Sequence, residues 1–145
     1  MKTDAIDFCM RVSLAHASLC LKLDDELGTY HGLALADFIA LRLLAQAEGG
    51  RLPVAALVRP LGRQASAVMR ELMRLEKTGF VQRERGAEGR HEVLLRPGGR
   101  RVVSEALVTA EQVCAPALGE LPAEALPAVS GAMNALCRTP ALLPA

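Results

Sequence analysis

The spacing of apolar residues predicts a chain made mainly of helices. Apolar side chains recur every three or four positions through most of the sequence, and glycine or proline interrupts the runs. The first helix carries apolar residues on two neighbouring faces, so we expect it to be largely buried, with a break at Gly28 to Gly32. The predicted helices cover residues 4–26, 35–47, 53–59, 64–78, 100–118 and 123–137.

Two short segments in the middle of the chain are predicted strands. Residues 80–84 alternate weakly between apolar and polar, residues 92–95 form a returning strand, and Gly86 to Gly89 joins them as a flexible loop. Arg51-Leu52 could add one bridge to this small sheet. The fold class is therefore mainly α with a small β-hairpin (α+β), and its middle reads as helix, turn, helix, hairpin.

Prolines and glycines set the predicted boundaries of several elements. Pro53 suits the first turn of the short helix that it begins, and Pro60-Leu61-Gly62 stops that helix. Gly79 is well placed to cap the helix over 64–78 in a left-handed conformation. Pro97-Gly98-Gly99 is expected to separate the returning strand from the long helix near 100–118.

Composition favours a soluble protein that associates with itself. Hydrophobic residues make up 51% of the 145 positions, yet there are only three Phe, one Tyr and no Trp. One explanation is a large apolar face buried against a second copy of the chain. No uncharged apolar run approaches the roughly 20 residues that span a bilayer, and no export signal is visible. We therefore expect a cytoplasmic protein without a membrane partner.

Charge is distributed very unevenly along the sequence. The segment from Arg51 to Arg101 holds twelve basic and five acidic residues, a formal charge of +7, whereas the rest of the chain carries −6. A net charge of +1 therefore conceals a strongly basic middle. Such asymmetry indicates a polyanionic partner, and the helix–turn–helix order within the block favours double-stranded DNA.

The helix over 64–78 has the character of a DNA-recognition helix. Its Ala65, Val68, Leu72 and Leu75 form one apolar stripe, and its basic residues lie roughly opposite. Side chains at the start of a recognition helix reach base edges, whereas other cations contact phosphates. The candidate base readers are Gln64, Ser66, Ala67 and Arg70, and the candidate phosphate contacts are Arg63, Arg74 and Lys77. The simpler alternative is that these are the solvated charges of an ordinary amphipathic helix.

The glycine-rich loop strengthens the DNA interpretation, because it lies within thirty residues of that helix and is also basic. A loop of this kind can approach the minor groove or the phosphate backbone closely. Its basic residues are Arg83, Arg85, Arg90 and His91, of which the last three are the DNA-binding candidates.

The run from Leu61 to Arg83 resembles the MarR-family winged-helix transcriptional regulators. That family carries L-G-x-S-x-x-x-V-x-R, then R-L-E-x-x-G and two apolar residues before x-R, followed by a D-x-R wing. The chain departs from this pattern in three places. Gln64 replaces the usual N-cap Ser, which weakens the cap. Glu88-Gly89-Arg90 stands in for D-x-R, with Glu in place of Asp and a spacing from Arg90 to Val93 that is one residue shorter than usual. Arg96 replaces the Thr of the V-x-L-T that follows the wing in the family.

The resemblance implies a domain plan and a function. Residues 1–145 would form a single MarR-like domain, with a winged helix-turn-helix DNA-binding lobe at about 33–99 and a helical dimerisation region from 1–30 and 100–145. Family members generally bind pseudo-palindromic operators as homodimers, and many release DNA when a small aromatic ligand binds. The chain would then be a homodimeric repressor released by a small aromatic or anionic effector. A winged-helix protein-interaction module is the alternative from another class.

The sensing chemistry is less apparent from the sequence. Cys9 lies near the place where the hydroperoxide-sensing branch of the family has its reactive cysteine, so a thiol-based redox sensor is an alternative. His16, His31, Asp37 and Arg42 could line an effector pocket, although locally hydrogen-bonded polar residues are the simpler interpretation. Four cysteines without a C-x-x-C pair and three scattered histidines indicate no metal site. No cofactor-binding or catalytic motif is present, so we expect neither a cofactor nor an enzyme.

Overall fold

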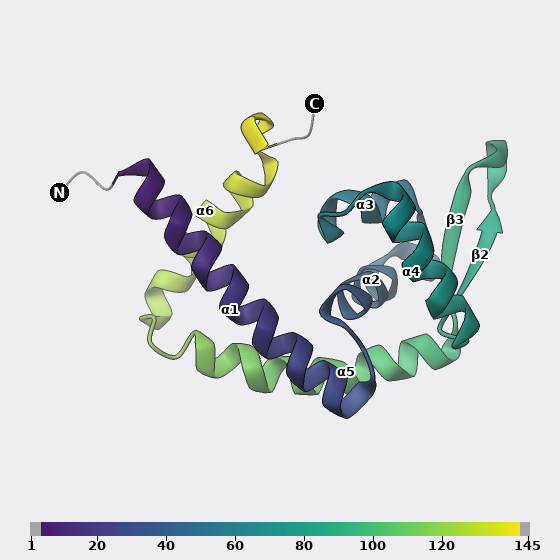
Figure 1. Cartoon of the computed structure of the whole chain (residues 1–145), viewed down its shortest axis with the longest axis horizontal. Coiled ribbons are helices and arrows are strands. Elements are labelled where there is room, and N and C mark those ends of the chain that lie inside the picture. Colours follow the sequence, from purple (N-terminus) through teal and green to yellow (C-terminus); the bar gives the residue numbers. More distant parts are fainter. Residues whose placement is uncertain (1–3, 143–145) are drawn as a thin grey trace. The chain divides into compact units, whose positions relative to one another are not determined.

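The computed structural model describes residues 4–142, which form six helices and one three-stranded sheet (Figure 1). The helices are α1 (Ala5–His31), α2 (Leu35–Gln46), α3 (Ala55–Leu61), α4 (Ala65–Lys77), α5 (Pro97–Ala117) and α6 (Leu126–Arg138). The strands are β1 (Arg51–Pro53), β2 (Val81–Arg85) and β3 (His91–Leu95), in the antiparallel order β1-β3-β2. The predicted class, mainly α with a small β-hairpin, is confirmed.

The chain divides into two compact units, one up to Val113 and one from Cys114 onward. The second contains the end of α5, two short 3-10 turns and α6. The predicted flanking segments, 1–30 and 100–145, extend into residues 1–3 and 143–145, which lie outside the described residues. The elements that carry the candidate DNA contacts all belong to the first unit.

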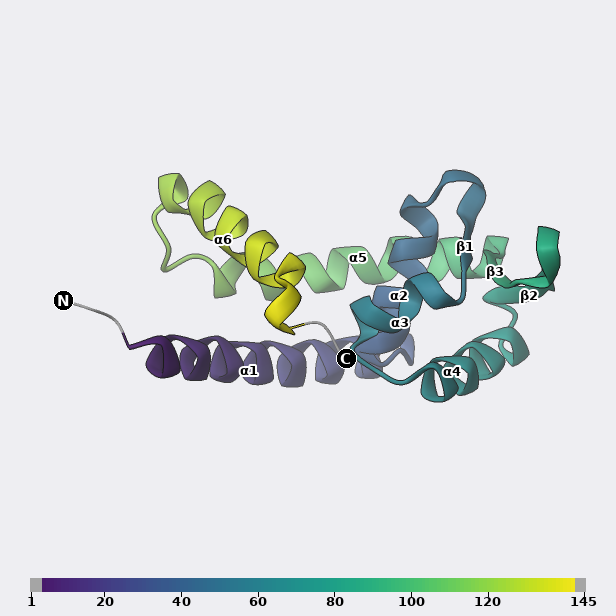
Figure 2. The same cartoon turned by 90° about the horizontal axis from the view of Figure 1, so that it is seen from above.

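Helix α1 is longer than its sequence predicts. It continues through Gly28 to His31 and is one continuous helix in Figure 2, so its predicted end at residue 26 is too early, and the break predicted within Gly28 to Gly32 falls at the last of these residues. The helix ends at Gly32 instead, whose left-handed conformation (φ 65°) lets its N–H donate to the Gly28 carbonyl at 3.1 Å. Asp4 caps the other end by accepting a hydrogen bond from the Ile6 N–H.

The expectation that α1 is largely buried is also wrong for the single chain. Only Leu23 and Leu27 of this helix are buried, near the end where it packs against α2. Ile6, Leu14 and Leu21 remain about 70% exposed. A wide apolar surface on a helix indicates that the helix is buried, but it does not tell whether the same chain or another molecule buries it.

The core of the first unit joins α2, α3 and α4 to one face of the sheet. The predicted apolar stripes are confirmed in α2, where Phe38, Leu41 and Leu44 are buried. They are also confirmed in α4, except that Ala65 at its first position is exposed. The remaining buried apolar residues of this core include Leu57, Val68, Leu72, Leu75, Val81, Val93 and Leu95.

Two boundaries differ from prediction because contacts within the folded chain override local preference. Pro53 does not begin a helix, since it lies in β1 opposite Glu92, and α3 starts at Ala55. Gly98 and Gly99 do not precede α5 but form its first turn. A Cβ atom on Gly99 would lie 2.2 Å from the Phe80 carbonyl oxygen, so glycine allows this end of α5 to pack closely against the chain entering β2.

Candidate nucleic-acid interface

The turn between α3 and α4 sets the direction of the recognition-helix candidate. Gly62 adopts a left-handed conformation (φ 62°) and ends α3, so the chain turns sharply before Ala65. As predicted for a weakened cap, the Gln64 side chain makes no hydrogen bond to the start of α4. Arg63 forms an ion pair with Glu71, one turn or more into the helix, which joins the turn to α4.

The outward face of α4 presents uncompensated cations. Val68, Leu72 and Leu75 are buried on the inner side, whereas Arg70 and Lys77 are exposed. Neither cation has a hydrogen bond or ion pair with any residue from 4 to 142. Ser66 is exposed beside them, and Ala67 is half-buried. This face is therefore available to a polyanionic partner without first breaking internal ion pairs.

Arg74 lies on the same helix but has a different environment. Its Nη2 donates to Oδ1 of Asp37, a carboxylate that is only 1% exposed, although Arg74 itself is half exposed. The other oxygen of Asp37 accepts the Ala34 N–H at 2.9 Å, at the start of α2. Asp37 is an effector-binding candidate from the sequence, and here one of its oxygens fastens α2 to α4 while the other accepts the N–H at the start of α2.

The hairpin of β2 and β3 forms a wing beside α4 (Figure 1). Its loop runs from Gly86 to Arg90, with Glu88 and Gly89 in left-handed conformations (φ 67° and 73°), and the Gly86 N–H donates to the Arg90 carbonyl. The Glu88–Arg90 pair that replaces the family's D-x-R contact is exposed and 3.8 Å long. Such a pair contributes little rigidity to the loop.

The last pair of opposed residues in the wing, next to its loop, consists of two DNA-binding candidates. Arg85 of β2 pairs directly with His91 of β3, and both side chains are exposed. Arg83, two residues before Arg85, is instead tied to α4: its backbone N–H donates to Glu76 at 2.8 Å and its side chain donates to the same carboxylate at 3.1 Å. These bonds hold the pKa of Glu76 below its ordinary value.

A second set of ion pairs that supports the wing was missed by sequence reasoning. Arg51 of β1 donates through Nη1 to Glu84 of β2 at 2.5 Å and to Glu92 of β3 at 3.1 Å. The two carboxylates raise the pKa of Arg51, mainly through the Glu84 hydrogen bond. The charge sum and the possible bridge at Arg51-Leu52 singled out Arg51, and the bridge is confirmed. The two carboxylate partners were missed because they lie more than thirty positions away in the sequence.

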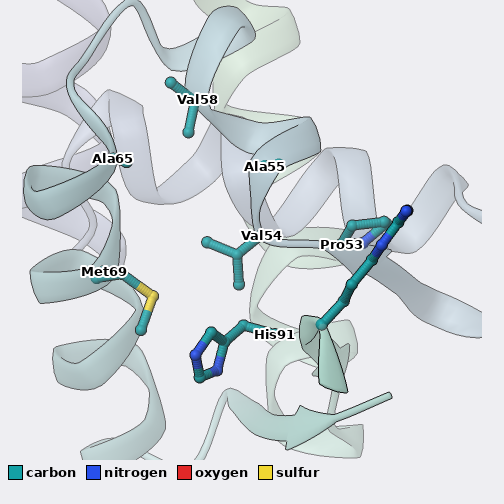
Figure 3. Close-up of a pocket in the computed structure, with 8 residues that line it drawn as sticks. Pro53, Val54, Ala55, Val58, Ala65, Met69 and His91 are labelled. Atoms are coloured by element: carbon teal, nitrogen blue, oxygen red, sulfur yellow. The ribbon is translucent and has the colours of Figure 1, made fainter. Parts of the chain in front are cut away.

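A hollow of about 560 Å³ separates α4 from the wing. Figure 3 shows the side chains of Met69 and His91 extending into the same space, which Val54 borders. The hollow is lined by Pro53, Val54, Ala55, Val58, Ala65, Met69, Arg90 and His91. Two predicted wing residues, Arg90 and His91, thus lie at the edge of an otherwise apolar surface next to the first turns of α4.

The remaining sensing candidates do not share partners. His16 lies on the exposed part of α1, with its ring nitrogens 3.5–3.6 Å from the Cys20 sulfur. His31 Nε2 is 2.7 Å from Thr109 Oγ1 of α5. Cys9 is exposed and makes no hydrogen bond to a described residue.

Arg42, another sensing candidate, lines a hollow. It lies beside a concavity of about 300 Å³ between α2 and α5, together with Arg100, Gln46 and Ser104 over an apolar floor that includes Leu107. Neither Arg42 nor Arg100 has an ion-pair partner within residues 4–142. Two cations and an apolar floor are suited to an organic anion.

Among the described residues there is no cluster of His, Cys, Asp or Glu able to hold a metal ion. Across the same part of the chain, none of the helices combines the length and the hydropathy that a bilayer crossing demands.

Comparison with known proteins gives a fold but no close sequence relative. No family model matches the sequence, and no curated protein matches it. A MarR-family regulator from Rhodococcus sp. RHA1 has a TM-score of 0.83 at 16% identity, covering 95% of this chain and 97% of its own. Sco3205 of Streptomyces coelicolor, a MarR-family regulator solved in complex with DNA, has a TM-score of 0.84 at 21% identity, covering 100% and 96%.

The protein has the MarR-family fold. NadR, solved in complex with 4-hydroxyphenylacetate, adds a TM-score of 0.78 at 19% identity and covers 95% of this chain and 96% of its own. In this MarR-like fold the helix–turn–helix is α3 and α4, and the wing is β2 and β3. The resemblance to the family from Leu61 to Arg83 is thus confirmed for the fold, and the Rhodococcus and Streptomyces proteins named above are MarR-family transcriptional regulators.

Proposed function

We propose that this protein is a transcriptional regulator that binds double-stranded DNA sequence-specifically. The observation that carries the proposal is the open face of α4, where Arg70 and Lys77 are exposed without internal partners beside a basic wing. An α-helix fits the major groove, and a wing on the same lobe reaches the neighbouring groove or backbone. The likeness in fold to Sco3205, which was solved with DNA, supports it.

The structure refines the role proposed for each DNA-binding candidate. Gln64, Ser66 and Arg70 are exposed at the first half of α4 and are proposed to read base edges, whereas half-buried Ala67 limits how closely a base approaches. Lys77 and Arg63 are proposed phosphate contacts. Arg74 is also a proposed phosphate contact, through the part of its guanidinium that is not committed to Asp37.

The wing supplies the remaining proposed contacts. Arg85 and His91 form the rung next to the loop, and Arg90 begins the loop's return. All three are exposed, and two of them border the hollow beside α4. We assign them to the phosphate backbone and minor groove flanking the α4 site.

We infer a homodimer on a pseudo-palindromic operator. The exposed apolar residues of α1, which include Ile6, Met10, Leu14 and Leu21, make an unusually apolar surface for a monomer. A second copy with two-fold symmetry would cover it and would place two α4 helices about one DNA turn apart. The same symmetry accounts for an operator made of two half-sites.

For regulation, we propose a repressor that is released from DNA by a small carboxylate. The α2–α5 hollow beside Arg42 has cations and an apolar floor, and the likeness in fold to NadR, solved with an aromatic carboxylate, supports this class of effector. A ligand there releases DNA only if it favours a conformation in which the two α4 helices no longer match the operator. No observation favours redox sensing by Cys9.

The deciding experiment is a titration of the purified protein on the DNA upstream of its own gene at several salt concentrations. Phosphate contacts displace counterions, so we expect the affinity to fall steeply as salt rises. A flat response would overturn the DNA proposal and favour the protein-interaction module. Arg11→Ala, which removes a cation from α1, is the control for overall charge.

A further inference from the structure

The outer face of the wing carries a continuous polar network. Because side chains alternate along a strand, Gln82, Glu84 and Glu92 lie on the face opposite the buried Val81 and Val93. Besides the Arg51 bonds to Glu84 and Glu92, Gln82 Nε2 donates to Glu84 at 3.4 Å, and Arg96 donates to Gln82 Oε1 at 3.1 Å. The network therefore ties together all three strands.

Two carboxylates lie at the centre of this network, and Arg51 is the cation that neutralises them. Glu84 and Glu92 are directly opposite each other in the β2–β3 register, an arrangement that is destabilising for two carboxylates. Their side chains are only 29% and 24% exposed, so water screens them incompletely. One guanidinium that donates to both converts the repulsive pair into a neutralised one.

The base of the wing loop depends on the same carboxylate. A Cβ atom at Gly86 would lie 2.5 Å from the Glu92 carboxyl carbon, so the Glu92 carboxylate packs directly against the Gly86 backbone. Gly86 also closes the loop through its hydrogen bond to Arg90. The position of Glu92, which Arg51 fixes, therefore bears on where the loop leaves the sheet.

The rung that follows Glu84 and Glu92 is Arg85 opposite His91. Alternation turns these two side chains to the face that meets α4, and Figure 3 shows His91 extending from β3 toward Met69 of α4. The Arg51 network thus lies on one face of the wing and the proposed DNA contacts lie on the other. A change in the twist of the strands would move both.

We propose that Arg51 is a positioning residue for DNA binding, which neutralises Glu84 and Glu92 and thereby holds Arg85 and His91 against the duplex. This inference rests on the proposed function. Without Arg51, two uncompensated carboxylates remain in the wing, where they push the strands apart and repel phosphates. Arg51 itself touches no DNA in this scheme, which distinguishes it from the phosphate contacts.

A mutant cycle separates positioning from direct contact. Operator affinity is measured by fluorescence anisotropy for wild type, Arg51→Ala, Glu84→Gln/Glu92→Gln, and the combination of all three substitutions. We expect Arg51→Ala to weaken binding about three- to tenfold, in line with two ion pairs and a released like-charge pair. In the background with both glutamines, the same substitution should change affinity by less than about twofold, because there is no charge left to neutralise.

Hydroxyl-radical footprinting adds a readout that a general loss of stability would not produce. Arg51→Ala should lose protection at the DNA flanking the α4 site while keeping it at the α4 site. Arg51→Lys keeps the positive charge but cannot donate to two carboxylates with the planar geometry of a guanidinium. Its protection of the flanking DNA should therefore lie between that of the wild type and that of Arg51→Ala. Arg51→Lys also replaces the alanine variant in the cycle if that variant does not fold.

The outcomes separate the two proposals. Suppose that the wild type binds DNA with the expected salt dependence, but that Arg51→Ala lowers operator affinity as much in the Glu84→Gln/Glu92→Gln background as in the wild type. Arg51 is then a direct DNA contact and the inference is wrong. Unchanged binding by Arg51→Ala in the wild-type background also overturns it. A wild type that binds no duplex overturns the proposed function, and the inference falls with it.

Discussion

Arg74 of α4 donates a hydrogen bond to Asp37 of α2, a carboxylate that is 1% exposed, so the recognition-helix candidate is fastened to the core by a charge pair. The second oxygen of Asp37 holds the Ala34 N–H. The pair fixes how α4 is presented, and it makes Arg74 differ from its neighbours on the same face.

Arg74→Ala should therefore lower stability. The substitution leaves a buried carboxylate without its partner, and we expect the free energy of unfolding to fall by about 3 kcal/mol in urea denaturation. Arg70→Ala is the matched control, since Arg70 is exposed and unpaired, and it should change stability by less than about 0.5 kcal/mol. Equal effects of the two variants would show that the Asp37 pair contributes nothing.

Arg70→Ala should instead lower DNA discrimination. If Arg70 reads a base, its loss should cost roughly 1–3 kcal/mol on the operator and much less on random DNA. Lys77→Ala should weaken binding to both DNAs alike and reduce the salt dependence by about one charge. Competition titrations with operator and random duplexes measure the affinity of each variant for both DNAs. If Arg70→Ala loses equal affinity for the two, Arg70 contacts phosphate and does not read a base.

Gly99→Ala should destabilise the first unit by about 1–3 kcal/mol, because the new methyl group overlaps the Phe80 carbonyl and the backbone must move. Gly28→Ala is the control: the added Cβ would meet only Leu33 O, at 3.9 Å, within a regular helix. That variant should gain about 0.5–1 kcal/mol from helix propensity. Thermal melting monitored by circular dichroism compares them.

Acid should weaken the bond between α4 and the wing. The pKa of Glu76 lies below its ordinary value of 4.5 because the ionised carboxylate accepts two hydrogen bonds from Arg83. The contribution of the Glu76 carboxylate to the free energy of unfolding is therefore complete above pH 4.5, and it is lost as the pH falls through the folded-state pKa of Glu76. Glu76→Gln should be less stable than wild type at pH 7 and should lose less stability between pH 5 and pH 3, measured by urea denaturation.

A Leu14→Lys/Leu21→Lys variant should be monomeric at micromolar concentration, because two charges would enter the apolar face proposed to join the copies. Thr29→Lys adds a charge at an exposed polar position of the same helix and should leave the dimer intact. Sedimentation velocity measures the mass of each. A monomeric wild type would refute the dimer proposal.

Local patterns in the sequence determined much of this protein. The stripe of Val68, Leu72 and Leu75 predicted both α4 and the side that it buries, since helical periodicity depends only on residues a few positions apart. The hairpin was predicted for the same reason, from two short strands and a glycine-rich loop. The excess of basic residues between Arg51 and Arg101 then predicted a polyanionic partner from the sequence alone.

Only the tertiary structure decided how the charges are shared. Asp37 and Arg74 are 37 positions apart, and Arg51 and Glu92 are 41 apart, so no local pattern pairs them. Packing also carried α1 through Gly28 and drew Pro53 into a strand, because backbone hydrogen bonds formed in the folded chain outweigh the weak preferences of single residues. The sequence supplied the cations, and the fold determined which of them remain exposed and unpaired among the described residues.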